Sequence, residues 1–166
     1  SLCFLDKEYQ ISYPDFTFVD KSDSSLEIPI QEQILLLHYL QASDLPALKG
    51  KWVSFREIPG ASFYIGPYMK RTTDPLKKIF GYDTQGFIKT ADQLKMTPVK
   101  VGDVGGELEI LPNVPIQVIL WQGDEEFAPE ASILYDESIR EIFCPEDVAW
   151  LGDMLVYRLI ALYKKC

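Results

Sequence analysis

The sequence predicts an α+β domain in which two main helices cover a mostly antiparallel sheet. Residues 30–42, just after Pro29, are apolar almost all round, and residues 145–163 carry apolar side chains at helical spacing. Several shorter segments alternate apolar and polar residues, as strands with one exposed face do. Strands and helices do not alternate strictly, which disfavours a parallel sheet. With 166 residues, 47% of them hydrophobic, residues 1–166 have the size and apolar content of a single domain.

The N-terminal strands come first. Residues 2–5 and 9–12 alternate around a short polar break, which predicts a hairpin, and residues 16–19 offer a further strand. The polar residues 21–25 then form a turn. Residues 51–56 alternate as another strand, which would point Arg56 and Glu57 to opposite faces.

The middle of the chain predicts short helices and a glycine-containing connection. Asp74 caps a helix that Pro75 begins and Gly81 ends, and residues 84–94 form a second one. Residues 99–103 and 108–111 bracket Gly105-Gly106, which suits a hairpin or a loop with positive φ.

Residues 116–121 are apolar on both faces, which predicts a central strand with residues 133–135 as its neighbour. In the last helix, Trp150, Met154 and Tyr157 widen the apolar stripe. Such a face permits a homodimer, or it is covered by a further segment ahead of residue 1.

Charge is unevenly distributed along the chain. Residues 124–153 hold ten acidic residues against Arg140 alone, whereas residues 49–100 hold ten basic residues against four acidic ones, which suggests a polarised surface. A net charge of −9 argues against nucleic-acid binding, because phosphate neutralisation needs a dense positive face. No apolar run approaches the roughly 20 residues that span a bilayer, so no membrane association is expected.

The three cysteines, Cys3, Cys144 and Cys166, lie far apart and form no metal-binding spacing. Sparse cysteine usage of this kind is typical of a soluble protein in the reducing cytoplasm. Three thiols cannot supply the four ligands of an iron–sulfur cluster. A metal centre would therefore need oxygen ligands or a partner protein, and the cofactor, if any, stays unknown.

The main candidate site follows the central strand. Trp121 ends the apolar run, and Asp124, Glu125 and Glu126 follow within a loop. Together with Asp136 these carboxylates offer oxygens for a hard cation or a surface for a cationic partner, with Asp124 and Asp136 as the best pair. The alternative is a solvated loop that the acids keep soluble.

Two further residues have alternative interpretations. His38, the only histidine, could act as a general base or as the axial ligand of haem or cobalt, or it could be a hydrogen-bonded core residue. Arg56 could clamp an anion, or it could pair with one of the acids at 124–126. No Gly-x-Ser-x-Gly elbow accompanies His38, so a serine triad is not indicated.

Four segments in a consistent order resemble a prokaryotic family, domain of unknown function 3786. They are residues 36–40 (LLHYL), 50–60 (GKWVSFREIPG), 120–127 (LWQGDEEF) and 133–138 (ILYDES). The resemblance implies an origin in anaerobic bacteria or archaea, near iron–sulfur or corrinoid proteins of one-carbon metabolism. It also implies a helical N-terminal stretch, in some members with a cysteine-rich cluster domain, ahead of residue 1, so we expect such a segment to be missing here.

Three functions remain open at this level. The first is a binding or accessory domain that recognises a cofactor or a metalloprotein or corrinoid-related partner near Arg56, Trp121, Asp124 and Asp136. The second is a small enzyme that uses Asp124 or Glu126 as general base, with or without a divalent ion. The third is an acidic domain that docks a basic partner.

Overall fold

Strands in the described part of the chain, residues 1–42 and 44–165 of a computed structural model, form two antiparallel sheets. Cys166 lies outside the described residues. The three-stranded sheet contains β1 (Leu2–Phe4), β2 (Lys7–Ser12) and β3 (Thr17–Asp20). The five-stranded sheet has the order β4 (Trp52–Ser54), β8 (Glu130–Asp136), β7 (Val114–Trp121), β6 (Val104–Leu111), β5 (Thr97–Pro98).

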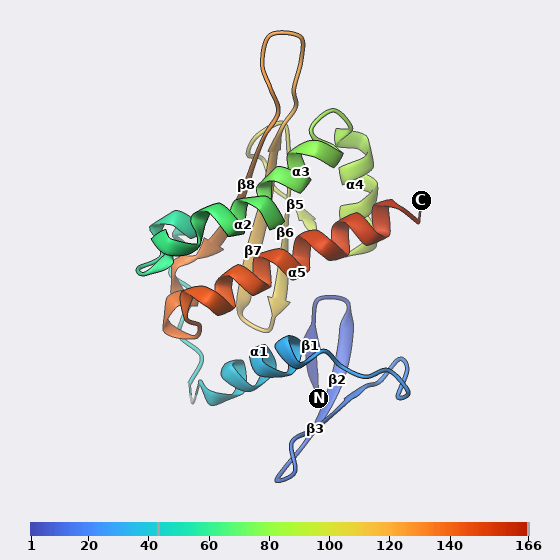
Figure 1. The fold of residues 1–166 in the computed structure, drawn as a ribbon, viewed down its shortest axis with the longest axis vertical. Coiled ribbons are helices and arrows are strands. Elements are labelled where there is room, and N and C mark those ends of the chain that lie inside the picture. Colours follow the sequence, from blue (N-terminus) through green and yellow to red (C-terminus); the bar gives the residue numbers. More distant parts are fainter. Residues whose placement is uncertain (43, 166) are drawn as a thin grey trace.

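The helices are α1 (Ile30–Gln41), α2 (Ile65–Arg71), α3 (Thr73–Phe80), α4 (Thr84–Gln93) and α5 (Pro145–Tyr163), with 3₁₀ turns at Phe55–Glu57, Ala61–Tyr64 and Glu137–Glu141. In Figure 1, α2, α3 and α5 lie across one face of the larger sheet, and α1 lies with the smaller sheet on the far side of α5. The predicted α+β class is confirmed, and the two predicted main helices are α1 and α5. In the described part of the chain, no helix combines the length and hydropathy that crossing a bilayer requires.

Strand β7 is the centre of the larger sheet, as its apolar sequence predicted. Ile116 lies opposite Tyr135 and Val118 opposite Ile133, and all four side chains are buried beneath the helices. The neighbouring strand predicted at residues 133–135 is the middle of β8. Seven of the eight residues of β7 are buried, as a strand with apolar side chains on both faces requires.

The helix layer meets the sheet at a pair of tyrosines. The hydroxyl groups of Tyr68 on α2 and Tyr135 on β8 are 2.9 Å apart and buried. Burial raises the pKa of Tyr68 to about 12, so it stays neutral and able to donate a hydrogen bond. Gly152 of α5 lies directly above, where a Cβ atom would be 2.5 Å from the Tyr135 hydroxyl oxygen. This glycine therefore lets α5 approach the sheet closely.

Three local predictions are wrong. The strand expected at residues 51–56 ends at Ser54, so Arg56 and Glu57 lie in a 3₁₀ turn and not on opposite faces of a strand. Asp74 lies in the first turn of α3, which begins at Thr73, and does not cap it. Gly105-Gly106 forms no turn but lies inside β6.

Packing explains the two glycines in β6. A Cβ on Gly105 would be 2.7 Å from the Val99 side chain, and one on Gly106 would be 3.1 Å from Met96. The absence of side chains at Gly105 and Gly106 lets residues 96–99 pack against β6. The turn itself lies between β6 and β7, where Asn113 has a φ of 61°.

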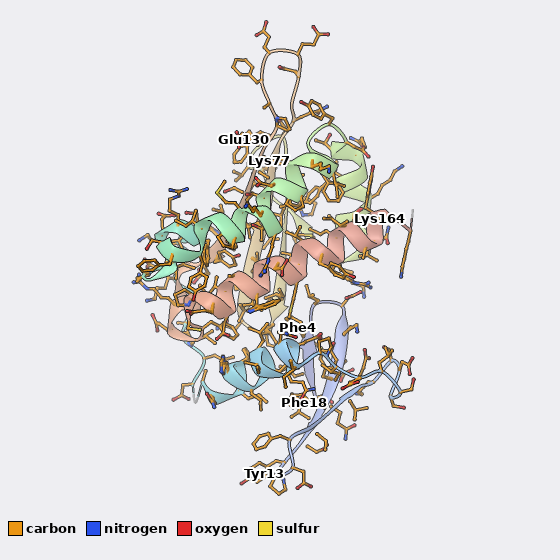
Figure 2. All side chains as sticks on the ribbon, in the orientation of Figure 1. Phe4, Tyr13, Phe18, Lys77, Glu130 and Lys164 are labelled. Carbon is orange, nitrogen blue, oxygen red and sulfur yellow. The ribbon has the colours of Figure 1, made fainter. Side chains whose placement is uncertain are left out.

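The smaller sheet confirms the predicted N-terminal hairpin and third strand. Leu2 lies opposite Tyr9 across β1 and β2, and β3 pairs with β2. The Leu5 N–H donates to the Ile110 carbonyl at 2.9 Å, which attaches the hairpin to β6. Figure 2 shows Phe4 at the end of this sheet nearest α5 and Tyr13 at the opposite tip.

The buried carboxylate of Asp136 organises the chain around β4. It accepts hydrogen bonds from the backbone N–H groups of Lys49 at 3.0 Å, Gly50 at 2.8 Å and Ser138 at 3.0 Å. Burial by itself would raise the pKa of Asp136, but these donors outweigh it and hold the pKa below its ordinary value. A carboxylate that accepts three backbone bonds joins the segment before β4 to the end of β8.

We predict that Asp136→Asn destabilises the fold by about 1–3 kcal/mol, because the amide NH₂ would face backbone N–H groups that need an acceptor. Urea unfolding of both proteins measures the difference. Since the pKa of Asp136 is depressed in the folded state, its stabilisation is complete above about pH 4, the ordinary aspartate pKa, and is lost as the pH falls further. The difference between wild type and variant should shrink there. Glu125→Gln, an exposed carboxylate, is the control, and an equal loss in both variants would contradict the account.

Candidate functional site

The acidic loop that follows β7 is exposed. In Figure 1 the segment between β7 and β8 protrudes beyond the end of the sheet. Asp124 accepts hydrogen bonds from the N–H groups of Glu126 at 2.8 Å and Phe127 at 2.7 Å, so its carboxylate shapes the loop. Glu125 and Glu126 are exposed, and Trp121 at the end of the strand is 40% exposed. The loop thus agrees with the solvated alternative.

Asp124 and Asp136 do not meet. Trp121 pairs with Glu130 at the start of β8, whereas Asp136 ends that strand, so the two carboxylates lie at opposite ends of β8. At the ordinary rise of a strand this separation is roughly 20 Å. Strand β8 runs antiparallel to β7, so it carries the chain back along the sheet and places Asp136 far from Asp124. Within residues 1–42 and 44–165, no group of three or more His, Cys, Asp or Glu side chains is placed to hold a metal ion.

Arg56 forms no ion pair with the acids at 124–126. It lines a cleft of about 150 Å³ together with Lys77 and Glu130, which lie near the base of the protruding loop (Figure 2). Its neighbour Glu57 accepts hydrogen bonds from the N–H and the hydroxyl of Ser54, at 2.7 and 3.0 Å. These donors lower the pKa of Glu57. The same hydrogen bonds stabilise the 3₁₀ turn Phe55–Glu57, so Glu57 has a structural role there.

The acidic third of the sequence is partly neutralised by the basic segment before it. Lys51 binds Glu137 at 2.9 Å, Lys49 binds Glu141, and Arg140 approaches Glu137 at 3.5 Å. Strand pairing between β4 and β8 brings these segments together. The two charged regions therefore do not form separate faces of the surface at this place.

His38 joins α1 to α5. Its Nδ1 is 2.7 Å from the Asp147 carboxylate, which is buried, while the imidazole is 41% exposed. A hydrogen-bonded core residue was one of the three interpretations of His38, and the structure shows the hydrogen bond but places the ring outside the core. Cys144 lies next to Asp147 at the start of α5, and although the residue is exposed, partial desolvation of its thiol together with the Asp147 and Glu146 carboxylates raises the pKa of the thiol to about 11. The thiol is therefore protonated at neutral pH and a poor nucleophile.

Two adjacent cavities along α5, which together we name the α5 groove, form the most developed site. The smaller, about 110 Å³, lies between α2 and α5 and is lined by Tyr64, Pro67, Tyr68, Arg71, Glu146 and Ala149. The larger, about 370 Å³, lies between α5, α1 and the β1–β2 turn and is lined by Phe4, Leu5, Asp6, Lys7, Glu32, Met154, Tyr157 and Arg158. Trp150 and Asp153 line both cavities.

Asp153 is the unusual residue of the α5 groove. Its half-buried carboxyl group has no hydrogen bond or ion pair within the described part of the chain. Burial raises the pKa of Asp153, and the nearby charge of Arg71 offsets this only in part. The Arg71 guanidinium instead lies over the Trp150 ring, 5.7 Å from its centre. A carboxylate kept without a partner in a cleft is typical of functional sites.

The chain was compared with known protein families, curated proteins and solved structures. Residues 1–158 match a family described as "Domain of unknown function (DUF3786)". The chain belongs to the DUF3786 family. The resemblance seen in the four sequence segments is thereby confirmed. No curated protein and no solved structure matches the chain.

The α5 groove of this DUF3786 chain was not predicted as a site. Trp150, Met154 and Tyr157 were noticed as a wide apolar stripe, and the groove lies along that stripe. The missed signal is Asp153, an acidic residue three positions after Trp150 on the same helix face. Its importance depends on Phe4, Glu32 and Arg71, which come from distant parts of the chain and which no local pattern connects with it.

We predict that Asp153→Asn stabilises this DUF3786 chain near neutral pH, by on the order of 0.5–1 kcal/mol, as removal of an unfavourable charge commonly does. Because the pKa of Asp153 is raised in the folded state, its ionisation costs stability above that pKa, and the cost disappears as the pH falls to the ordinary aspartate range. Thermal unfolding across pH 4–8 measures this. Asp15→Asn, an exposed aspartate in the β2–β3 turn, is the matched control. A variant less stable than wild type at neutral pH would contradict the assignment.

Proposed function

We propose that this DUF3786 chain is a ligand-binding or accessory domain whose ligand occupies the α5 groove. The observation that carries the proposal is the pair of cavities that share Trp150 and the unpartnered Asp153. The larger cavity, at about 370 Å³, falls within the 300–1,000 Å³ range of small-molecule sites. Five of its ten lining residues are apolar or aromatic and five are charged, and apolar surface with convergent charged groups suits a site that orients a ligand.

The α5 groove is supported better than the loop at 124–126. A general base needs a sheltered position, and Asp124 and Glu126 are exposed outside the two cavities. Asp124 also has a structural role in its loop. A docking role for the acidic third is weakened because Lys49 and Lys51 pair with two of its carboxylates. Binding in the α5 groove requires none of these residues.

The cellular setting belongs to the proposal as well. We infer a cytoplasmic protein of anaerobic metabolism that serves an iron–sulfur or corrinoid-related partner, on the basis of the family resemblance. The exposed, unpaired Cys3 and Cys144 support a reducing compartment. Tyr157, which is 75% exposed at the rim of the groove, offers a contact for such a partner or for a second copy of the chain.

We predict that Trp150→Ala weakens ligand binding about tenfold or more, as loss of a central aromatic side chain commonly does. Native mass spectrometry of protein purified without oxygen, with haem, corrinoids, amines and carboxylates added, detects the bound mass. Trp121→Ala removes an indole outside the groove and should bind as wild type does. If Trp121→Ala or Arg56→Ala abolishes binding while Trp150→Ala retains it, the site is at the other end of the sheet and the proposal fails.

A further inference from the structure

We propose that the larger cavity of the α5 groove binds an organic cation, an ammonium group attached to an apolar body. This inference rests on the proposed function and deepens it by naming the chemical class of the ligand. It follows from the way in which the charges on the cavity wall are paired, and from the aromatic side chains between them.

Both basic residues of the larger cavity already have carboxylate partners. Arg158 donates through Nε to both oxygens of Asp6, at 3.1 and 3.0 Å. Lys7 lies 3.1 Å from the buried carboxylate of Asp20, behind the cavity wall. An anionic ligand would therefore compete with an existing ion pair for either cation.

Two carboxylates on the same wall, Glu32 and Asp153, form no ion pair with a residue that the structure describes, although the charge of Arg71 acts on Asp153 from the smaller cavity. Glu32 accepts a hydrogen bond from the Tyr9 hydroxyl, and burial raises the pKa of Tyr9 well above its ordinary value, so this partner stays neutral. Asp153 has neither a hydrogen bond nor an ion pair among the described residues. Among the residues that line the larger cavity, the three carboxylates outnumber the two basic groups, and in a partly buried place a cation is attracted more strongly than in water.

The rest of the lining suits an apolar body. Phe4, Met154 and Tyr157 line the larger cavity, and Trp150 separates it from the smaller one. Aromatic faces attract ammonium groups as well as apolar carbon. Arg71 lies over the Trp150 ring and lines only the smaller cavity. Its guanidinium therefore does not occupy the larger cavity, where the ligand would bind.

The raised pKa of Asp153 agrees with this assignment. Burial without a partner disfavours its charged form, and a bound ammonium would remove that penalty. The other charged side chains that line the larger cavity are Asp6 and Lys7 at the β1–β2 turn, Glu32 on α1 and Arg158 on α5, and Arg71 and Glu146 line the smaller one.

Three probes with one carbon skeleton test the inference: 4-phenylbutylammonium, 4-phenylbutanol and 4-phenylbutyrate. Each is titrated into the ¹⁵N-labelled chain, and the indole N–H resonance of Trp150, assigned by its absence in Trp150→Phe, reports binding. We expect the ammonium probe to bind about tenfold more tightly than the alcohol, as charge-assisted contacts allow, and the carboxylate probe to bind most weakly.

Variants then locate the charge that matters. Glu32→Gln and Asp153→Asn should each remove most of the preference for the ammonium probe over the alcohol. Glu125→Gln and Asp15→Asn remove the same charges at distant exposed positions and should preserve it. Glu32→Gln retains an acceptor for Tyr9, and if it nevertheless fails to fold, Asp153→Asn alone decides.

The outcomes separate the two proposals. If the alcohol binds as tightly as the ammonium probe, or the carboxylate probe binds best, the groove binds ligands but the cation assignment is overturned. If none of the probes shifts the Trp150 resonance at millimolar concentration, the proposed function of the α5 groove is overturned as well. A preference for the ammonium probe that persists in both groove variants also contradicts the inference.

Discussion

The hydrogen bond between the hydroxyl groups of Tyr68 and Tyr135 is the contact on which the rest of the structure depends. It joins α2 to β8 of the larger sheet, and Gly152 lets α5 lie directly over it. These three residues therefore set how closely two helices approach the sheet and each other. The smaller cavity of the α5 groove, with Tyr64 just before α2, Arg71 at the end of α2, and Trp150 and Asp153 on α5, has its shape because of that spacing. A buried polar pair holds such a geometry better than apolar contacts alone, since an unpaired hydroxyl would be costly.

The larger cavity depends on a different part of the chain. The β1–β2 hairpin is bound to β6 through Leu5, and α1 is bound through Tyr39, whose hydroxyl donates to the Pro112 carbonyl at 2.9 Å. His38 completes the attachment by its contact with Asp147. The β1–β2 hairpin and α1 thus pack beside α5 and leave the larger cavity open between them. In this cavity, Glu32 and Asp153 form no ion pair with any described residue, a local cost in stability that packing elsewhere offsets, as is common at binding sites.

Much of the fold could be predicted because it depends on local patterns. The apolar residues on both faces of β7 require a central strand, and the spacing of Val148, Leu151 and Leu155 requires a helix. The site could not be predicted in the same way. Asp124 and Asp136 were expected to pair because consecutive acidic residues seldom converge on one ion, yet the direction of β8 separates them. Asp153 carries no local signal in the sequence, since its surroundings come from Phe4, Glu32 and Arg71, which lie far from it in the chain. Gly105 and Gly106 suggested a turn, whereas the packing of Met96 and Val99 explains them.

A crystal structure of the chain soaked with 4-phenylbutylammonium tests the central claim most directly, namely that the ligand site of this DUF3786 domain lies along α5. The account predicts density for the phenyl group against Trp150 and Met154 in the larger cavity, with the ammonium group at hydrogen-bond distance from the Asp153 or Glu32 carboxylate. Density confined to the loop at 124–127 or to the cleft beside Arg56, with the α5 groove empty, would contradict it.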